Sequence, residues 1–331
     1  IKSLVASSKF MKAINIKSFG GPEVLEVIDN AIKPNITDSE VLIKVKAAGI
    51  NRPDIIQRMG LYPPPPGASD ILGLEVSGTI VEVGSKVDRN YMNKDVCALL
   101  SGGGYAEYAS CDISTVMSIP KNISLIDACA IPETFFTVWT NLFDTAKILK
   151  DEVLLIHGGA SGIGLTAITI AQAMGIKCIA TVGSKEKEEY LSKLNLEMVI
   201  NYNSQDFEEN IKQKFKGVDV ILDMVGGDYF QKNINLLNRN GRLINIAYLR
   251  GSKVEANLLP IMLKRLVVTG STLRVRSNEE KYEIKKNIEK YIWPLFEQKM
   301  IKLHIDKYFE MIDVVKAHQY MENNENIGKI L

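Results

Sequence analysis

Residues 153–164 read VLLIHGGASGIG, and this stretch decides the fold of the 331-residue chain. The apolar run from Val153 to Ile156 predicts a strand that is buried on both faces. After the glycines, a helical pattern places five apolar residues on one face, namely Ile163, Ala167, Ile170, Ala171 and Met174. A second apolar run, 178–182, closes a strand–helix–strand unit of about 30 residues. The pattern predicts a dinucleotide-binding βαβ unit.

The glycine turn follows the G-x-G-x-x-G fingerprint with one change. Gly159 and Gly164 hold the outer positions, and Ser161 fills the middle one. Glycine is needed because the turn is tight and the backbone must approach a pyrophosphate at the helix N-terminus. An ordinary strand–helix turn would also use glycines, but the strand–turn–helix–strand context favours nucleotide binding. We expect Gly159, Gly162, Ile163 and Gly164 to contact the nucleotide.

The end of the second strand bears on which nucleotide binds. An NAD site usually places Asp or Glu about 20 residues beyond the glycines, to accept from the ribose hydroxyl. Here the strand runs into Gly183, Ser184 and two lysines, with no carboxylate at its tip. Ser184 is also placed to cap the next helix. A solvated helix start with surface lysines is the alternative, and the neighbouring glutamates fit it. The pattern favours NADPH over NADH, with Gly183, Ser184 and Lys187 near the phosphate.

Composition excludes several classes of protein. Apolar residues make up 46% and charged residues 24%, as in ordinary globular proteins, and the length predicts two domains. A net charge of +1 gives no global attraction to nucleic acid or anionic lipid. No apolar stretch reaches the length of a membrane span, and no secretory h-region is present. We therefore expect neither a nucleic-acid nor a membrane partner.

The cysteines and histidines are widely spaced, which argues against a disulfide framework or a zinc ribbon. The four cysteines are expected to be buried free thiols in a reducing compartment, and we predict a cytoplasmic location. His157 ends the first strand of the nucleotide domain and is expected to be packed and hydrogen-bonded. The cysteines are Cys97, Cys111, Cys129 and Cys178.

Four stretches follow one another along the chain. Residues 1–10 are expected to lie outside the fold, because a strand pattern opens at Met11. Residues 11–132, rich in short alternating strands and glycine turns, predict an antiparallel, barrel-like domain. Residues 133–304 predict a doubly wound parallel sheet, and residues 305–331 are expected to return to the first domain. The six candidate strands of the parallel sheet are 153–157, 177–182, 198–202, 219–225, 242–248 and 266–272.

Several further motifs stand in order along residues 11–331. They read GGPEVL (20–25), GINRPD (49–54), QRMGLYPPPPG (57–67), ILGLEVSG (71–78), AIPE (130–133), ILDMVGG (221–227) and NIGK (326–329). In these motifs and the glycine turn, the chain resembles the zeta-crystallin-like NADPH:quinone oxidoreductases of the medium-chain dehydrogenase/reductase superfamily. It is most similar to the tumour-suppressor-inducible quinone oxidoreductase subgroup. The resemblance implies a GroES-like β-barrel-type catalytic domain and an NADPH-binding Rossmann domain.

One departure concerns zinc. Zinc-dependent members of the superfamily carry Gly-His-Glu where this chain has Gly73-Leu74-Glu75, and the closely spaced cysteines of their zinc lobe are missing. Without the His and the thiolates, we expect no bound metal. Glu75 is then expected to be a hydrogen-bonding residue within its domain. A quinone needs less help than an alcohol, whose alkoxide a metal normally stabilises. The resemblance thus implies zinc-independent transfer of reducing equivalents from NADPH to a quinone.

The resemblance also assigns roles to individual residues. Tyr62, in a loop stiffened by four prolines, would contact the quinone, although a surface tyrosine packed on prolines fits the sequence equally well. Ser161 would lie beside the cofactor, or act only as a small spacer. Asp54 would orient Asn51 or donate a proton, with a structural cap favoured. The cofactor would further contact Asn51 and Thr137 at the nicotinamide, Tyr202 at the ribose-phosphate, and Ala247, Leu273 and Asn326.

Alternatives remain open for activity and for assembly. An enone or 2-enoyl thioester reductase would share fold and cofactor, with Tyr62 as proton donor. A structural, crystallin-like or RNA-binding role is the other class, and the absence of a basic–aromatic stripe argues against RNA. The apolar last strand, 266–272, predicts an unpaired edge, and the resemblance implies a homodimer through it, with Leu273 and Arg274 held near the cofactor. In the alternative monomer, residues 278–293 would cover this edge.

Overall fold

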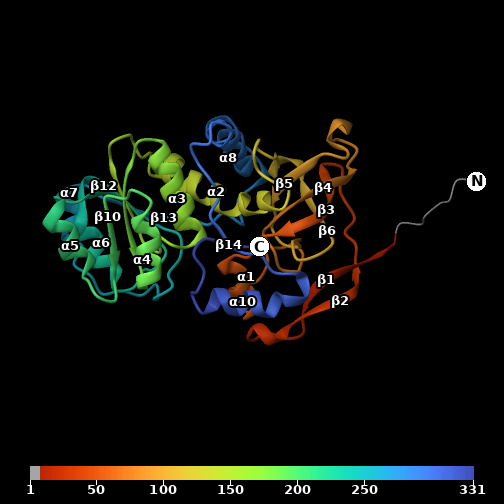
Figure 1. Cartoon of the computed structure of the whole chain (residues 1–331), viewed down its shortest axis with the longest axis horizontal. Helices are drawn as coiled ribbons and strands as arrows, with labels where there is room; N and C mark the ends of the chain where they lie inside the picture. Colours follow the sequence, from red (N-terminus) through yellow and green to blue (C-terminus); the bar gives the residue numbers. More distant parts are fainter. Residues whose placement is uncertain (1–7) are drawn as a thin grey trace, which may run out of the picture. The chain divides into compact units, whose positions relative to one another are not determined.

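A computed structural model describes residues 8–331, which form two compact units (Figure 1). The first unit contains the described residues up to Glu133, together with Arg274–Glu297 and Ile305–Leu331. The second unit contains Thr134–Leu273 and Gln298–His304. Within the described residues, no helix is both long and apolar enough to cross a membrane.

A curled antiparallel sheet forms the centre of the first unit. Its strand order is β6-β3-β4-β5-β7. Val41 and Ile43 on β3 are buried, while Lys44 and Lys46 are exposed, as the alternation predicts. Register shifts between β3 and β4 mark irregularities of the kind that bend a strand. The sheet confirms the predicted GroES-like half-barrel. Its strands are β3 (Glu40–Ala48), β4 (Glu75–Val83), β5 (Asp95–Leu99), β6 (Tyr108–Asp112) and β7 (Val116–Ser118).

A hairpin, two helices and a late strand pair complete this part of the first unit. Strands β1 (Phe10–Ile16) and β2 (Leu25–Ile32) pair in antiparallel fashion. Near the end of the chain, β14 (Ile305–Lys307) pairs in parallel with β15 (Lys329–Ile330). The helices are α1 (Arg52–Arg58) and α10 (Val314–Glu322).

The expected start of the fold at Met11 is wrong by two residues. Phe10 pairs with Ile32 in the hairpin, and the Lys33 N–H donates to the Lys9 carbonyl over 3.0 Å. Residues 9 and 10 therefore extend the β1–β2 ladder, because backbone pairing does not depend on the side-chain pattern that opens at Met11. The rest of the predicted extension, residues 1–7, lies outside the described residues.

The second unit is built on a six-stranded parallel sheet in the order β10-β9-β8-β11-β12-β13. In chain order this is 3-2-1-4-5-6, the doubly wound arrangement that the sequence predicts. The strands are β8 (Val153–Ile156), β9 (Lys177–Val182), β10 (Met198–Asn201), β11 (Val218–Asp223), β12 (Leu237–Asn245) and β13 (Val267–Gly270). The connecting helices are α3 (Gly162–Ala173), α4 (Lys185–Ser192), α5 (Phe207–Lys214), α6 (Tyr229–Leu236) and α7 (Leu259–Lys264).

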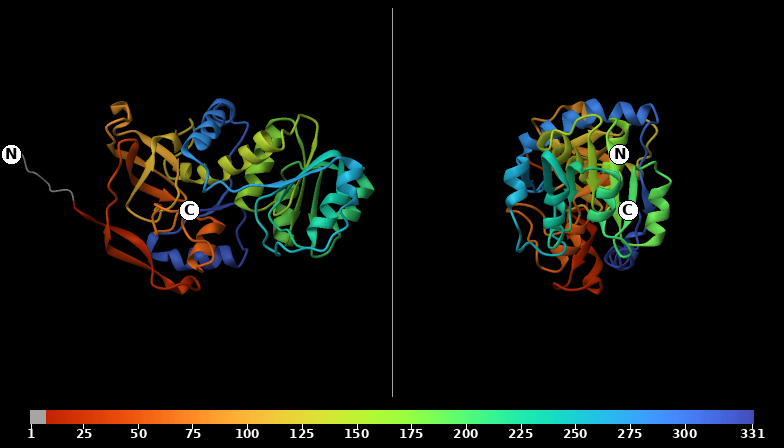
Figure 2. Two further views of the ribbon diagram at one scale, coloured as in Figure 1. Left: turned by 180° about the vertical axis from the view of Figure 1, so that it is seen from behind. Right: turned by 90° about the vertical axis from the view of Figure 1, so that its left-hand side faces the viewer.

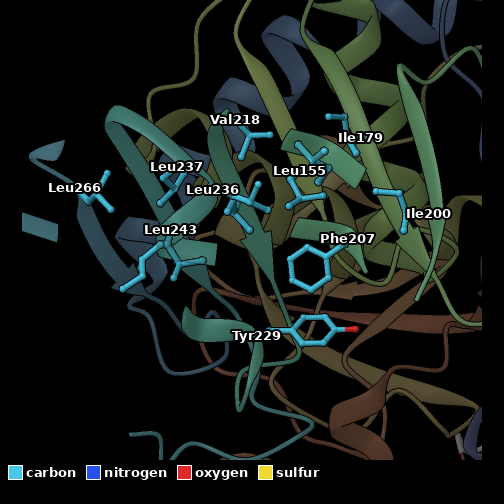
Figure 3. Packing of buried hydrophobic residues seen from close by; sticks show 13 residues of the cluster. Leu155, Ile179, Ile200, Phe207, Val218, Tyr229, Leu236, Leu237, Leu243 and Leu266 are labelled. Carbon is cyan, nitrogen blue, oxygen red and sulfur yellow. The ribbon is translucent and has the colours of Figure 1, made fainter. Parts of the chain in front are cut away.

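Apolar side chains from five of these strands form one buried cluster that includes two aromatic rings (Figure 3). The rings of Phe207 and Tyr229 lie 4.9 Å apart, and the His157 ring packs within 4.8 Å of both. His157 Nδ1 lies 2.9 Å from Thr181 Oγ1, and its Nε2 lies 2.8 Å from Asn233 Oδ1. His157 is thus packed and hydrogen-bonded as predicted, and its burial lowers its pKa.

Three further helices lie near the points of the sequence at which the chain passes from one unit to the other. Helix α2 (Pro132–Trp139) continues as a π-helical turn, Thr140–Thr145, and buries Phe135, Phe136 and Trp139. Helices α8 (Asn278–Tyr291) and α9 (Trp293–Glu297) belong to the first unit, where the Trp293 indole donates to the Ser118 carbonyl over 3.1 Å. The expected nucleotide-binding domain, residues 133–304, included this segment, which the structure assigns to the first unit. Figure 2 gives two further views of the chain.

The buried surface of α3 is wider than the predicted stripe. Leu165, Thr166 and Ile168 are buried alongside Ala167, whereas Ile163 is partly exposed. The four cysteines are buried and unpaired, as predicted.

Candidate functional site

The glycine turn after β8 is shaped by close backbone contacts. Gly158 has φ +68°, a left-handed conformation that favours glycine, and the predicted fingerprint did not include it. A Cβ on Gly159 would lie 2.6 Å from Ala180 Cβ, and one on Gly164 would lie 2.3 Å from the Gly158 oxygen. These glycines therefore let α3 approach β8 and β9 more closely than any side chain would allow.

Ser161 caps α3 with its side chain. Its Oγ accepts from the Gly164 N–H over 2.9 Å and donates to the Gly158 carbonyl over 2.7 Å. Gly162 and Ile163 form the partly exposed first turn, whose N–H groups have no partner within the helix. A helix N-terminus with no bulky side chain in front of it fits a pyrophosphate. Ser161 is thus a structural cap, and its contact with a cofactor stays a prediction.

The ends of β9 and β10 bring together the residues predicted for the ribose-phosphate. Ser184 Oγ accepts from the Lys187 N–H over 3.2 Å and so caps α4, as expected. A Cβ on Gly183 would lie 2.2 Å from Tyr202 Oη, so the tyrosine ring occupies the space that glycine leaves. The Asn203 amide donates to the Gly183 carbonyl over 2.7 Å and fixes the strand tip. The structure thus brings Gly183, Ser184, Lys187 and Tyr202 together at neighbouring strand tips, and their contact with a ribose-phosphate stays a prediction.

Three other predicted cofactor residues lie in the second unit. Ala247 follows β12 and Leu273 follows β13, at the carboxyl ends of parallel strands, where open α/β sheets bind ligands. Thr137 is buried, and its carbonyl accepts from the Asn141 amide over 2.8 Å. Asn141 in turn accepts from Ser271 Oγ over 2.7 Å, which ties α2 to the segment after β13.

In the first unit, Tyr62 lies against a cation. The Arg274 guanidinium carbon lies 5.3 Å from the centre of the Tyr62 ring. Arg274 is buried and donates to the Ser101 carbonyl over 2.8 Å and to Gln57 Oε1 over 2.8 Å. Its Nη1 has no hydrogen-bond partner among the described residues. A donor of this kind next to a tyrosine can hold a carbonyl oxygen or an anion.

A buried charge cluster surrounds Asn51. The Asn51 N–H donates to Asp54 Oδ2 over 2.9 Å in a capping box at the start of α1. Its side-chain amide donates to Glu75 Oε1 over 3.0 Å and accepts from Lys329 Nζ over 2.8 Å. Lys329 forms an ion pair with Glu75, and the Glu133 N–H donates to Glu75 Oε2 over 2.8 Å. Glu75 is therefore the internal hydrogen-bonding residue, and Asp54 the structural cap, that the sequence predicts.

Asn326 supports this cluster through the backbone. Its side-chain amide donates to the Gly328 carbonyl over 2.9 Å, in the turn that precedes Lys329. Lys329 and Glu133 lie within the motifs NIGK (326–329) and AIPE (130–133), but the sequence predicts no role for either residue. Their partners lie far away in the chain, so no local spacing identified them.

The carboxyl groups of this cluster titrate unusually. Burial raises the pKa of Asp54 to about 6, although hydrogen bonds from Asn51 and Tyr105 oppose the shift. Burial and the neighbouring Glu75 carboxylate raise the pKa of Glu133 to about 8. Glu133 therefore retains its proton at neutral pH.

A directional hydrogen-bond network links Asp54 to α10. Arg58 Nη1 lies 2.8 Å from His318 Nδ1, and because a guanidinium can only donate, this nitrogen must accept. His318 Nε2 therefore carries the proton and donates to Tyr105 Oη over 3.2 Å. The Tyr105 hydroxyl donates to Asp54 Oδ2 over 2.7 Å. Burial and Arg58 lower the pKa of His318 to about 3. The sequence analysis did not predict this network.

Comparison with known proteins shows related sequences and folds. Residues 37–121 match the family model "Alcohol dehydrogenase GroES-like domain", and residues 162–289 match "Zinc-binding dehydrogenase". The quinone oxidoreductase of Mus musculus is 32% identical over 84% of this chain and 85% of its own length. The structure of the quinone oxidoreductase from Coxiella burnetii matches with a TM-score of 0.81 and 27% identity, covering 97% of this chain and 98% of that one. The apo form of JamJ enoyl reductase matches with a TM-score of 0.85 and 26% identity, covering 97% and 98%.

The His318 network predicts a pH dependence of folding stability. The pKa of His318 is about 3 in the folded protein and about 6.5 in an unfolded chain. Between these values only the unfolded state binds the proton, so stability falls as the pH falls through this window. His318 should therefore lower the free energy of unfolding of the wild type by about 1.4 kcal/mol for each pH unit between pH 6.5 and 3. His318→Gln should remove this pH dependence.

Urea unfolding of both proteins at pH 7.5 and 5.5 measures the effect. Asp54, with its raised pKa, contributes with the opposite sign in both proteins, so the difference between them isolates His318. Equal loss of stability on acidification in the two proteins would contradict the prediction.

Proposed function

The chain belongs to the zeta-crystallin-like quinone oxidoreductases of the medium-chain dehydrogenase/reductase superfamily, and we propose that it transfers reducing equivalents from NADPH to a quinone without zinc. The observation that carries the proposal is the environment of Glu75. Its carboxylate is committed to Lys329, Asn51 and the Glu133 N–H, beside the buried Leu74. These partners form a closed ion-pair cluster where zinc-dependent relatives use Gly-His-Glu, and they do not fit a zinc ligand set. On this ground we propose that the chain binds no zinc at this position, although one matched family model is named for zinc binding.

The parallel-sheet unit is of the type that binds a nicotinamide cofactor, which supplies a hydride when bound. The glycine turn would hold the pyrophosphate through Gly159, Gly162, Ile163 and Gly164. The tips of β9 and β10 would hold a 2′-phosphate through Gly183, Ser184, Lys187 and Tyr202. The nicotinamide end would contact Asn51, Thr137, Ser161, Ala247, Leu273 and Asn326.

The chain's own residues would orient the substrate. Lys329 and Glu75 fix the Asn51 amide, so this group needs no reorganisation when ligands bind. Tyr62, from the loop that contains four prolines, and Arg274, which lies against its ring, would contact a quinone oxygen. We assign the catalytic contacts to Tyr62 and Ser161.

A substrate panel tests the proposed function. Para-quinones, ortho-quinones, enals and enoyl thioesters are assayed with NADPH before and after exhaustive chelation. We expect quinones to be reduced fastest, at a rate that chelation leaves unchanged. Stoichiometric zinc by elemental analysis, with activity lost on its removal, would overturn the metal-free proposal.

Reduction of an enone or 2-enoyl thioester is the second candidate, favoured by the likeness to JamJ enoyl reductase. Such a reaction needs a proton for the α-carbon, and Tyr62 would donate it. Tyr62→Phe separates the two candidates. It should affect enone reduction more than quinone reduction if the hydroxyl is a proton donor.

The strand tip predicts a preference for NADPH over NADH. Charge-assisted hydrogen bonds to a phosphate contribute roughly 1.5–3 kcal/mol, which corresponds to at least tenfold tighter binding. Lys187→Ala should reduce the difference in affinity between NADPH and NADH. Lys185→Ala, a change at an exposed lysine of the same helix, should leave this difference unchanged. Calorimetric titration with both nucleotides measures the effect. Equal affinities in the wild type would contradict the preference.

The edge strand supports a homodimer. Val267 and Val268 on β13 are 51% and 38% exposed at the end of the sheet, so this strand offers apolar surface and unpaired backbone groups. We propose that β13 pairs with its copy across a two-fold axis. Val268→Glu should dissociate the dimer and lower activity in parallel, while Val254→Glu, also exposed, should do neither. Sedimentation of a fully active wild-type monomer at micromolar concentration would refute the proposal.

The four cysteines bear on location. All four are buried free thiols, which suits a reducing compartment. We accordingly propose a cytoplasmic location.

A further inference from the structure

Glu133 is the accessible end of an otherwise buried charge cluster. Glu75 is 0% exposed, Lys329 5% and Asn51 7%, whereas Glu133 is only partly buried. The Glu133 backbone is nevertheless fixed, because its N–H donates to Glu75 Oε2 over 2.8 Å. A carboxyl group in this position can meet a ligand and can also exchange its proton with solvent.

The charges around Glu133 come from four different elements. Glu75 on β4 and Asp54 on α1 disfavour a second negative charge, while Lys329 on β15 and Lys281 on α8 favour it. Lys329 is already paired with Glu75, and Lys281 Nζ donates to the Arg274 carbonyl over 2.9 Å. Loss of hydration on burial is the largest cause of the shift and the repulsion adds to it, so the pKa of Glu133 is raised to about 8.

The position of Glu133 relates it to the reacting end of the cofactor. Glu133 shares the Glu75 carboxylate with Asn51, which we expect at the nicotinamide. Thr137, the other residue expected there, follows Glu133 by one turn of α2 and lies on the same helix face. The cluster thus places an acid next to Asn51, a residue expected at the nicotinamide.

We propose that Glu133 is the proton donor of the reaction, an inference that rests on the proposed function. Hydride addition gives the quinone two electrons and leaves negative charge on its oxygen, which needs one proton. An O–H bond forms at that oxygen as the Oε–H bond of Glu133 breaks. The Glu133 carboxylate then regains a proton from water. An acid whose pKa lies near the working pH suits this task.

Glu133→Gln tests the donor role, because glutamine keeps the shape of the side chain but has no acidic proton. We expect kcat to fall about 100-fold with KM little changed, and the decline of the wild-type rate above about pH 8 to disappear. Glu289→Gln is the matched control. Glu289 is also a partly buried glutamate of the first unit with a raised pKa, and it faces Lys285 instead of this cluster.

The basicity of the reduced substrate separates proton donation from a structural role. Tetrachloro-benzoquinone gives a weakly basic reduced oxygen, and tetramethyl-benzoquinone a strongly basic one. The loss of kcat in Glu133→Gln should be at least tenfold smaller for the chlorinated substrate. An equal loss for both quinones, or no loss for either, would overturn the role of Glu133.

A second measurement uses the protein without cofactor. Infrared titration of the resting protein should show a protonated carboxyl band that disappears near pH 8, is absent in Glu133→Gln and persists in Glu289→Gln. Absence of this band from the wild type would overturn the inference whatever the substrate. A wild type that reduces no quinone would instead overturn the proposed function, and the donor role with it. Glu133→Asp, which keeps the acid, should retain the alkaline decline in rate even if Glu133→Gln folds poorly.

Discussion

The buried ion pair between Lys329 and Glu75 is the contact on which the first unit's polar interior depends. It joins β15 to β4, fixes both ends of the Asn51 amide and, through Glu75, orients the start of α2. Removing one partner of such a pair typically costs 3–5 kcal/mol, because the other charge is left buried and alone. The pair also explains Gly49, where a Cβ would lie 1.9 Å from Glu75 Oε1. A single electrostatic contact therefore sets the backbone, the amide and the local pKa values together.

The second unit depends on a different constraint, which is steric. Its glycines remove side chains where α3 meets β8 and β9. Its core is mainly apolar, and the buried ring of His157 is hydrogen-bonded to the buried side chains of Thr181 and Asn233. Polar groups in this unit serve mainly as caps, as at Ser161 and Ser184. The two units thus differ in chemistry: polar side chains of the second unit serve mainly as helix caps, and the first unit contains carboxyl groups of raised pKa.

Local patterns predicted the second unit well because its information lies within short windows. Five of the six strands begin within one residue of their predicted starts, whereas β12 begins at Leu237 instead of 242, since its Asn-Arg-Asn-Gly segment has no strand pattern. The candidate site was predicted only where motifs are contiguous. Lys329 pairs with a residue 254 positions away, and Arg58 contacts one 260 positions away, so no spacing could reveal either contact. Gly158 was missed because the fingerprint begins at Gly159, and the need for glycine at position 158 lies in its positive φ, which the motif does not record.

The discontinuity of the first unit bears on how the chain is made. A ribosome delivers Glu75 early and Lys329 about 250 residues later, at roughly 5–20 residues per second. All residues of the second unit, with its parallel sheet and its core, are made in that interval. The Glu75 carboxylate lacks its counter-ion until Lys329 is made. During synthesis, the second unit is therefore expected to complete its fold before the first unit, whose last residues are made after it.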